Sequence, residues 1–206
     1  MAYMMVHLLV ADLWAKGHPE YLDSPEYYYG AVAPDAIHIR DGNDKSHKNE
    51  IHLNNWGKLH RQDVVDYWRV RRAPFDVGYG VHVLTDAQWV PRYEERLRGL
   101  FKPDGKLDID LYFLENITTD FALLHGIPRL GELLALLERA EIPSDHPLLT
   151  AHEFSAWREK ILRAYRAECP QHEPVRFIDV DYVLDFVTDS IALIDEVYAE
   201  AMRGIA

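Results

Sequence analysis

A histidine and an aspartate lie four residues apart at His82 and Asp86, in a stretch that we expect to be helical. Residues at this spacing are neighbours on the helix surface, with about 5–6 Å between their Cβ atoms, so both can bind one metal ion. His7, Asp35 and His47 precede this pair in the chain. The ordered set of five indicates a metal centre built from imidazole and carboxylate ligands rather than an isolated pair.

Each of these residues also has a plain structural interpretation. His7 shares an apolar helical face, and a buried histidine can satisfy its nitrogens inside a core. Asp35 follows a proline at a helix end, where an aspartate commonly bonds to its own backbone. His47 lies in a polar loop, and His82 can hydrogen-bond to Asp86 at the surface. With 11 histidines and 34 acidic residues, chance alone gives about two histidine–acid pairs at this spacing, so the pair proves little by itself.

The composition is that of an acidic globular protein. A chain of 206 residues is long enough for one domain with a substantial core. The formal net charge of −12 repels phosphate backbones, so we expect no specific nucleic-acid partner. Cys169 is the only cysteine, which excludes a disulfide within the chain and a thiolate zinc cluster. A metal site in this chain must therefore use His, Asp and Glu.

The apolar segments are short. None reaches the roughly 18–20 residues needed to span a bilayer. Residues 1–10 lack the basic start and the cleavage site of a signal peptide. We therefore expect a cytoplasmic protein without integral membrane association, and the oligomeric state stays open.

Helical patterns extend over almost the whole chain. Capping patterns occur at Ser24-Pro25 and at Thr150 with Glu153. Residues 34–57 look irregular, and no period-2 run is long enough for a sheet. Helices are predicted over 3–16, 24–32, 61–72, 76–100, 108–124, 128–140, 150–168 and 180–203. The sequence thus predicts an all-α fold, a helical bundle with one domain over residues 1–206.

Two glycines, Gly78 and Gly80, precede His82 inside a predicted helix. Glycine in a helix interior is less favourable than alanine by up to about 1 kcal/mol. Their presence therefore predicts that another backbone segment packs closely against the helix near His82.

Three motifs follow one another in a characteristic order. They are Tyr-Gly-Ala-Val-Ala-Pro-Asp at residues 29–35, Lys-Ser-His at 45–47, and Gly-Tyr-Gly-Val-His-Val-Leu-Thr-Asp at 78–86 with Trp89 behind it. This order resembles the zinc-dependent phospholipase C family, and more closely its uncharacterised bacterial intracellular branch. The resemblance covers roughly residues 4–125. It implies an all-helical fold, a cleft with zinc ions bound by His, Asp and Glu, and hydrolysis of phosphodiester bonds in phospholipids.

The resemblance also implies a ligand set. The family's metal ligands correspond here to His7, Asp35, His47, His82 and Asp86. A later His-x3-Glu pair of the family is absent from this sequence, and Asp120, Glu115 or His125 could take its place. Secreted members also use the amino group of the mature N-terminus, whereas six residues precede His7 here. We expect one to two zinc ions, although such ligands also suit Mn²⁺ or Fe.

The predicted function is a metal-dependent, phospholipase C-like phosphoesterase that uses a metal-activated water on a small phosphoester substrate. Asp35 would also orient the water, and His38 or His52 would protonate the leaving oxygen. One alternative is an HD-type nucleotide phosphohydrolase, although the chain contains no His-Asp dipeptide. The other is a non-catalytic metal-binding helical module that keeps its metal for structure or binds a partner.

Overall fold

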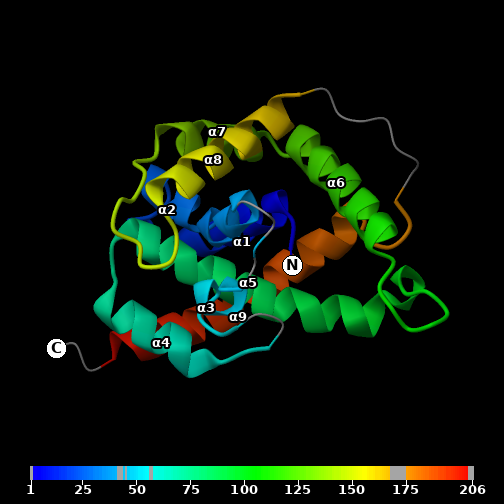
Figure 1. Cartoon of the computed structure of the whole chain (residues 1–206), viewed down its shortest axis with the longest axis horizontal. Coiled ribbons are helices and arrows are strands. Elements are labelled where there is room, and N and C mark those ends of the chain that lie inside the picture. Colours follow the sequence, from blue (N-terminus) through cyan, green and yellow to red (C-terminus); the bar gives the residue numbers. More distant parts are fainter. Residues whose placement is uncertain (1, 41–43, 45, 56–57, 168–174, 204–206) are drawn as a thin grey trace.

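The computed structural model describes residues 2–40, 44, 46–55, 58–167 and 175–203 (Figure 1). Within these ranges the chain forms no strand, and a single isolated antiparallel bridge joins Phe101 to Leu107. The α-helices are α1 (Met4–Ala15), α2 (Pro25–Gly30), α3 (Lys48–Ile51), α4 (Arg61–Val70), α5 (Pro74–Arg96), α6 (Ile109–Gly126), α7 (Pro128–Arg139), α8 (Ala151–Arg166) and α9 (Val180–Met202). The described residues also form the 3₁₀ helices η1 (Ala33–Ile39) and η3 (Arg98–Leu100). The predicted all-α class is confirmed.

Local signals in the sequence set most helix ends. The Ser24 side chain accepts a hydrogen bond from the backbone N–H of Tyr27 at the start of α2. Thr150 and Glu153 form the reciprocal capping box that opens α8. The predicted irregular segment 34–57 contains η1 and the single helical turn α3 in its described part. That difference matters, because these two short helices carry residues of the site.

The first helix, α1, lies at the centre of the molecule and packs against α2, α5, α6, α7 and α9 (Figure 1). All its residues except Leu13 are buried. A helix that is apolar on every side is stable only when other elements enclose it. The two polar side chains on α1, His7 and Asp12, are consequently forced into the interior.

The backbones of α2 and α5 approach each other closely, as the glycine positions predicted. A Cβ atom at Gly78 would lie 1.9 Å from the carbonyl oxygen of Tyr27, and one at Gly30 would lie 2.0 Å from that of Phe75. The neighbour of Gly80 is instead a side chain, the indole of Trp68. The close contact at Gly78 places the end of α2 against α5 one turn before His82.

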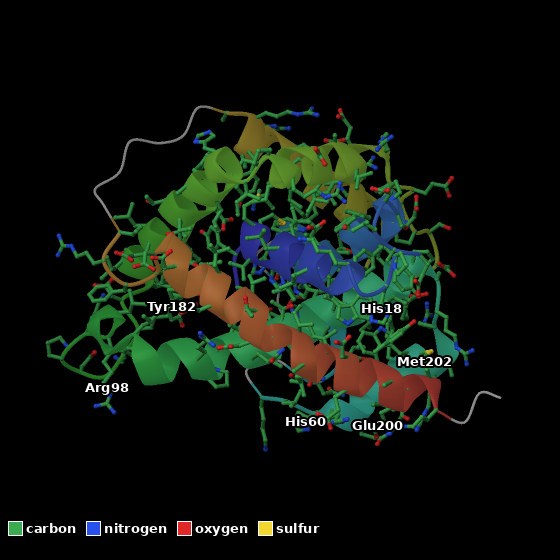
Figure 2. All side chains as sticks on the ribbon, turned by 180° about the vertical axis from the view of Figure 1, so that it is seen from behind. His18, His60, Arg98, Tyr182, Glu200 and Met202 are labelled. Atoms are coloured by element: carbon green, nitrogen blue, oxygen red, sulfur yellow. The ribbon has the colours of Figure 1, made fainter. Side chains whose placement is uncertain are left out.

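The last helix, α9, covers the opposite side of the molecule (Figure 2). It extends from the Tyr182 end to the Met202 end and packs on α1, α4 and α5. Arg61 of α4 bridges to Glu196 and Glu200 at 2.7 Å each. None of the helices formed by the described residues is long and apolar enough to cross a bilayer.

Candidate metal centre

Five ligand-type side chains meet in the interior beside the centre of α1. They are His7 of α1, Asp35 of η1, His52 directly after α3, and His82 and Asp86 of α5. Each is at most 4% exposed. Four segments that are distant in the sequence therefore bring three imidazoles and two carboxylates to one buried point.

Asp86 connects three of these side chains. Its Oδ1 lies 3.5 Å from Nε2 of His7 and accepts a hydrogen bond from the backbone N–H of Ala2 at 2.7 Å. Its Oδ2 lies 3.6 Å from Nε2 of His52 and 3.7 Å from Nε2 of His82. A tetrahedral ion with bonds of 2.0–2.1 Å holds its ligand atoms about 3.3–3.4 Å apart. The separations fit such an ion after small shifts, and the two oxygens face different histidines, as a bridging carboxylate requires.

Asp35 completes the group from the other side. Its Oδ1 lies 3.7 Å from Nε2 of His52. The ligand atoms form two overlapping sets, each within 4.8 Å, namely His7–Asp35–His82 and His52–His82–Asp86. Because His82 belongs to both sets, the five side chains form one centre rather than two separate ones.

Backbone carbonyls fix the orientation of two of the imidazoles. Nδ1 of His82 lies 2.9 Å from the carbonyl oxygen of Ala31, and Nδ1 of His52 lies 2.8 Å from that of Lys48. A carbonyl oxygen only accepts, so the hydrogen sits on Nδ1 and the lone pair of Nε2 faces the carboxylates. This is the arrangement by which proteins orient metal-binding histidines.

Several buried polar atoms of the centre lack a hydrogen-bond partner among the described residues. They are both ring nitrogens of His7, Nε2 of His82, Oδ1 of Asp35 and Oδ2 of Asp86. The rings of His7 and His82 stack with centroids 3.9 Å apart and planes 10° apart. Leaving such atoms unsatisfied is costly. A cation with imidazole and carboxylate ligands would satisfy all of them except the second ring nitrogen of His7, so the residues present fit a metal ion.

The charges of the cluster favour a cation as well. Burial lowers the pKa of His7, and burial together with the charge of His7 lowers that of His82 to about 3. Burial alone would raise the pKa of Asp35 and Asp86. The contact with His38 holds the pKa of Asp35 well below its usual range. The positive charge of the N-terminal amino group, followed by the nearby imidazoles, lowers the pKa of Asp86. Near neutral pH the cluster thus combines ionised carboxylates with the neutral imidazoles of His7 and His82, and this buried negative charge favours a bound cation.

The structure does not bring His47 to the cluster. Its side chain is 53% exposed, and its Nδ1 lies 3.1 Å from Oε2 of Glu50. His47 stands at the outer start of α3, whereas His52 follows the end of that turn and points inward. The sequence offered His52 as one of two candidates for proton transfer, whereas its distances to Asp35 and Asp86 are those expected of the loop ligand.

His38 lies at the edge of the cluster and reaches solvent. Its Nε2 is 3.4 Å from Oδ1 of Asp35 and 3.1 Å from Nζ of Lys48, and its side chain is 17% exposed. It lines a cavity together with Asp35. Among the two histidines considered for proton transfer, His38 is the one that a bound ligand could contact.

Asp120 is buried but lies outside both ligand sets. Its Oδ2 accepts a hydrogen bond from the backbone N–H of Met5 at 3.1 Å and another from the hydroxyl of Tyr165. The residue at the N-cap of α1, Tyr3, provides no side-chain cap. Asp120 therefore supplies from α6 the acceptor that the start of α1 lacks.

The two alternatives to Asp120 are also elsewhere. The carboxylate of Glu115 accepts hydrogen bonds from the backbone N–H groups of residues 176, 177 and 178 at 2.8–2.9 Å. His125 is exposed near the end of α6. Neither side chain belongs to a ligand set among the described residues.

An Asp120→Asn variant should change how stability depends on pH. Burial raises the pKa of Asp120 to about 7 in the folded chain, above its usual value of about 3.9 in an unfolded chain. The folded state therefore keeps a proton between about pH 4 and 7 that the unfolded state releases, and the free energy of unfolding falls as pH rises through this window. The full effect is up to about 4 kcal/mol.

Asparagine keeps an oxygen acceptor for Met5 and Tyr165 but does not titrate. The difference in urea-unfolding free energy between variant and wild type, both freed of metal by chelator, should grow in favour of the variant from pH 4 to 7 and stay constant above. A constant difference across the whole range would show that Asp120 is ionised throughout.

No family model, curated protein or solved structure matches this chain. Conclusions about its activity therefore come from the geometry of the centre and from the order of its motifs.

Proposed function

We propose that the chain is a metal-dependent phosphoesterase, similar to phospholipase C, with a centre formed by His7, Asp35, His52, His82 and Asp86. The observation that carries the proposal is this buried group of three imidazoles and two carboxylates. Among the described residues, no hydrogen-bond partner is present for either ring nitrogen of His7, for Nε2 of His82, or for one oxygen each of Asp35 and Asp86. Zn²⁺ suits such ligands best, and Mn²⁺ or Fe²⁺ are also compatible. The centre would take one or two ions.

A metal ion bound there would supply the positive charge that a phosphate needs and a nucleophile from water at neutral pH. The chain itself provides the groups that move protons. Asp35 accepts a proton from the attacking water and orients it toward phosphorus. The new bond joins the water oxygen to phosphorus, and the bond from phosphorus to the alcohol oxygen breaks. His38 delivers a proton to that oxygen, so the products are the phosphate and the free alcohol.

The positions of His52 and His38 indicate which of them is a metal ligand and which transfers the proton. His52 is 1% exposed and its Nε2 points at Asp35 and Asp86, which suits a ligand. His38 lies on the cavity side of Asp35, where an alcohol oxygen could reach it. We therefore assign proton transfer to His38 rather than to His52.

A non-catalytic metal-binding module would show the same ligands. The presence of an accessible histidine and a cavity directly beside the centre favours catalysis over that alternative. An HD-type nucleotide phosphohydrolase is disfavoured because no His-Asp dipeptide occurs in the chain. We expect a small phosphoester as the substrate, and we propose that the protein is located in the cytoplasm.

Turnover of generic phosphoesters tests the proposal. Protein loaded with Zn²⁺, Mn²⁺ or Fe²⁺ should release nitrophenol from 4-nitrophenyl phosphate or bis(4-nitrophenyl) phosphate. A His38→Gln variant should keep its metal and lose about 10²–10⁴-fold in rate if His38 transfers the proton. Metal-loaded wild type with no turnover of either ester above the chelated protein would favour the non-catalytic module.

A further inference from the structure

A cavity of about 420 Å³ opens directly beside the candidate metal centre. Its walls come from the N-terminal segment, from η1, from α6 and from α8, the last two of which flank the start of α1 (Figure 1). The lining is mostly apolar, with the aromatic rings of Tyr3, Phe113, Trp157 and Tyr165. The volume lies in the range of small-molecule sites.

The polar end of this cavity belongs to the centre. Asp35 and His38 line it, and the ring of His38 lies 6.2 Å from that of Trp157. Lys160 also lines the cavity, and its Nζ lies 5.3 Å from the centroid of the Trp157 ring. A ligand that reaches the centre with its phosphate must therefore place its organic part against aromatic walls.

These walls are held in place before any ligand binds. The indole N–H of Trp157 donates to the carbonyl oxygen of Val32 at 2.7 Å, and the hydroxyl of Tyr165 donates to the buried Asp120. Such fixed walls lower the entropic cost of binding. Phe113 is different, because it is 43% exposed and its ring is tilted 56° to that of Tyr3, with the ring centroids 6.3 Å apart. It can adjust over a bound group.

We propose that this cavity binds the organic group of the substrate and selects phosphoesters of apolar, ring-containing alcohols over those of small alcohols. The inference rests on the proposed function, because the phosphate must sit at the Asp35 and His38 end. A bound ring buries more apolar surface against these walls than a methyl group does, so its burial contributes more to binding. The cavity therefore acts as the specificity site of the reaction.

Benzyl phosphate and methyl phosphate are the matched substrates, since their leaving alcohols have similar acidity. Metal-loaded wild type should show kcat/KM at least about tenfold higher for benzyl phosphate. Ala164→Trp fills the cavity from α8, and Phe113→Ala removes one wall. Both should reduce that preference toward unity, mainly by lowering kcat/KM for benzyl phosphate. Ala122→Trp, at an exposed position of α6, is the control.

Binding of phenylphosphonate and methylphosphonate, measured by calorimetry, separates the two proposals. Tighter binding of the phenyl compound that is lost in Ala164→Trp supports the cavity even if no ester is hydrolysed, and then only the reaction is wrong. Hydrolysis with no preference for benzyl phosphate, or a preference that neither variant reduces, overturns the cavity proposal and leaves the reaction standing.

Discussion

A His82→Asn variant is expected to lose metal binding and the thermal stabilisation that metal provides. Nε2 of His82 is the ligand atom shared by both sets, so its removal leaves neither complete. Asparagine retains an amide N–H close to where Nδ1 donates to Ala31, so the packing of α2 on α5 is largely kept. An ion present at about 1,000 times its Kd stabilises the native state by about 4 kcal/mol, which corresponds to about 8–16 °C in Tm for a chain of this size.

The measurement is the difference in Tm with Zn²⁺ and with chelator. Wild type should show the full shift and His82→Asn none, while the two proteins should melt at similar temperatures in chelator. His125→Asn, at an exposed histidine on α6, is the control and should behave as wild type. A full metal-dependent shift in His82→Asn would mean that the ion binds elsewhere.

The second large expected effect is on zinc affinity, and it distinguishes His52 from His47, five residues earlier. His52→Asn should weaken Zn²⁺ binding by at least about 100-fold, because it removes a ligand while keeping an N–H for the carbonyl of Lys48. His47→Asn should change the affinity less than about twofold, since that side chain is 53% exposed and belongs to neither ligand set.

Competition with a chromogenic zinc chelator measures both affinities. The motif order assigns the loop ligand to His47, whereas the structure places His52 against Asp35 and Asp86. The reverse ranking of the two variants would restore the assignment made from the sequence and require a different conformation of residues 46–55.

The helices were predictable because their signals are local. Ser24 before Pro25, the Thr150–Glu153 box and the prolines at 74 and 128 each act within one turn, and the structure has helix ends close to the predicted positions. The pair His82 and Asp86 was predictable for the same reason. Only helical spacing is needed to bring these two side chains to one face of α5.

The loop ligand and the cavity depend on tertiary structure and have no local signal. Whether His47 or His52 faces the centre is decided by the single turn of α3, which lies in a segment without helical periodicity. Trp157 and Tyr165 come from α8, far along the chain, and aromatic residues there look like ordinary core. The missing His-x3-Glu pair also pointed to Asp120, which instead caps α1.

The content of bound metal tests the central claim most directly. Protein purified without chelator and then dialysed against a trace of Zn²⁺ is analysed for all transition metals, in parallel with His82→Asn. We predict one or two ions per chain in wild type and less than a tenth of that in the variant. Wild-type protein that carries no transition metal and binds none of Zn²⁺, Mn²⁺ and Fe²⁺ when they are added would contradict the metal centre and the function built on it.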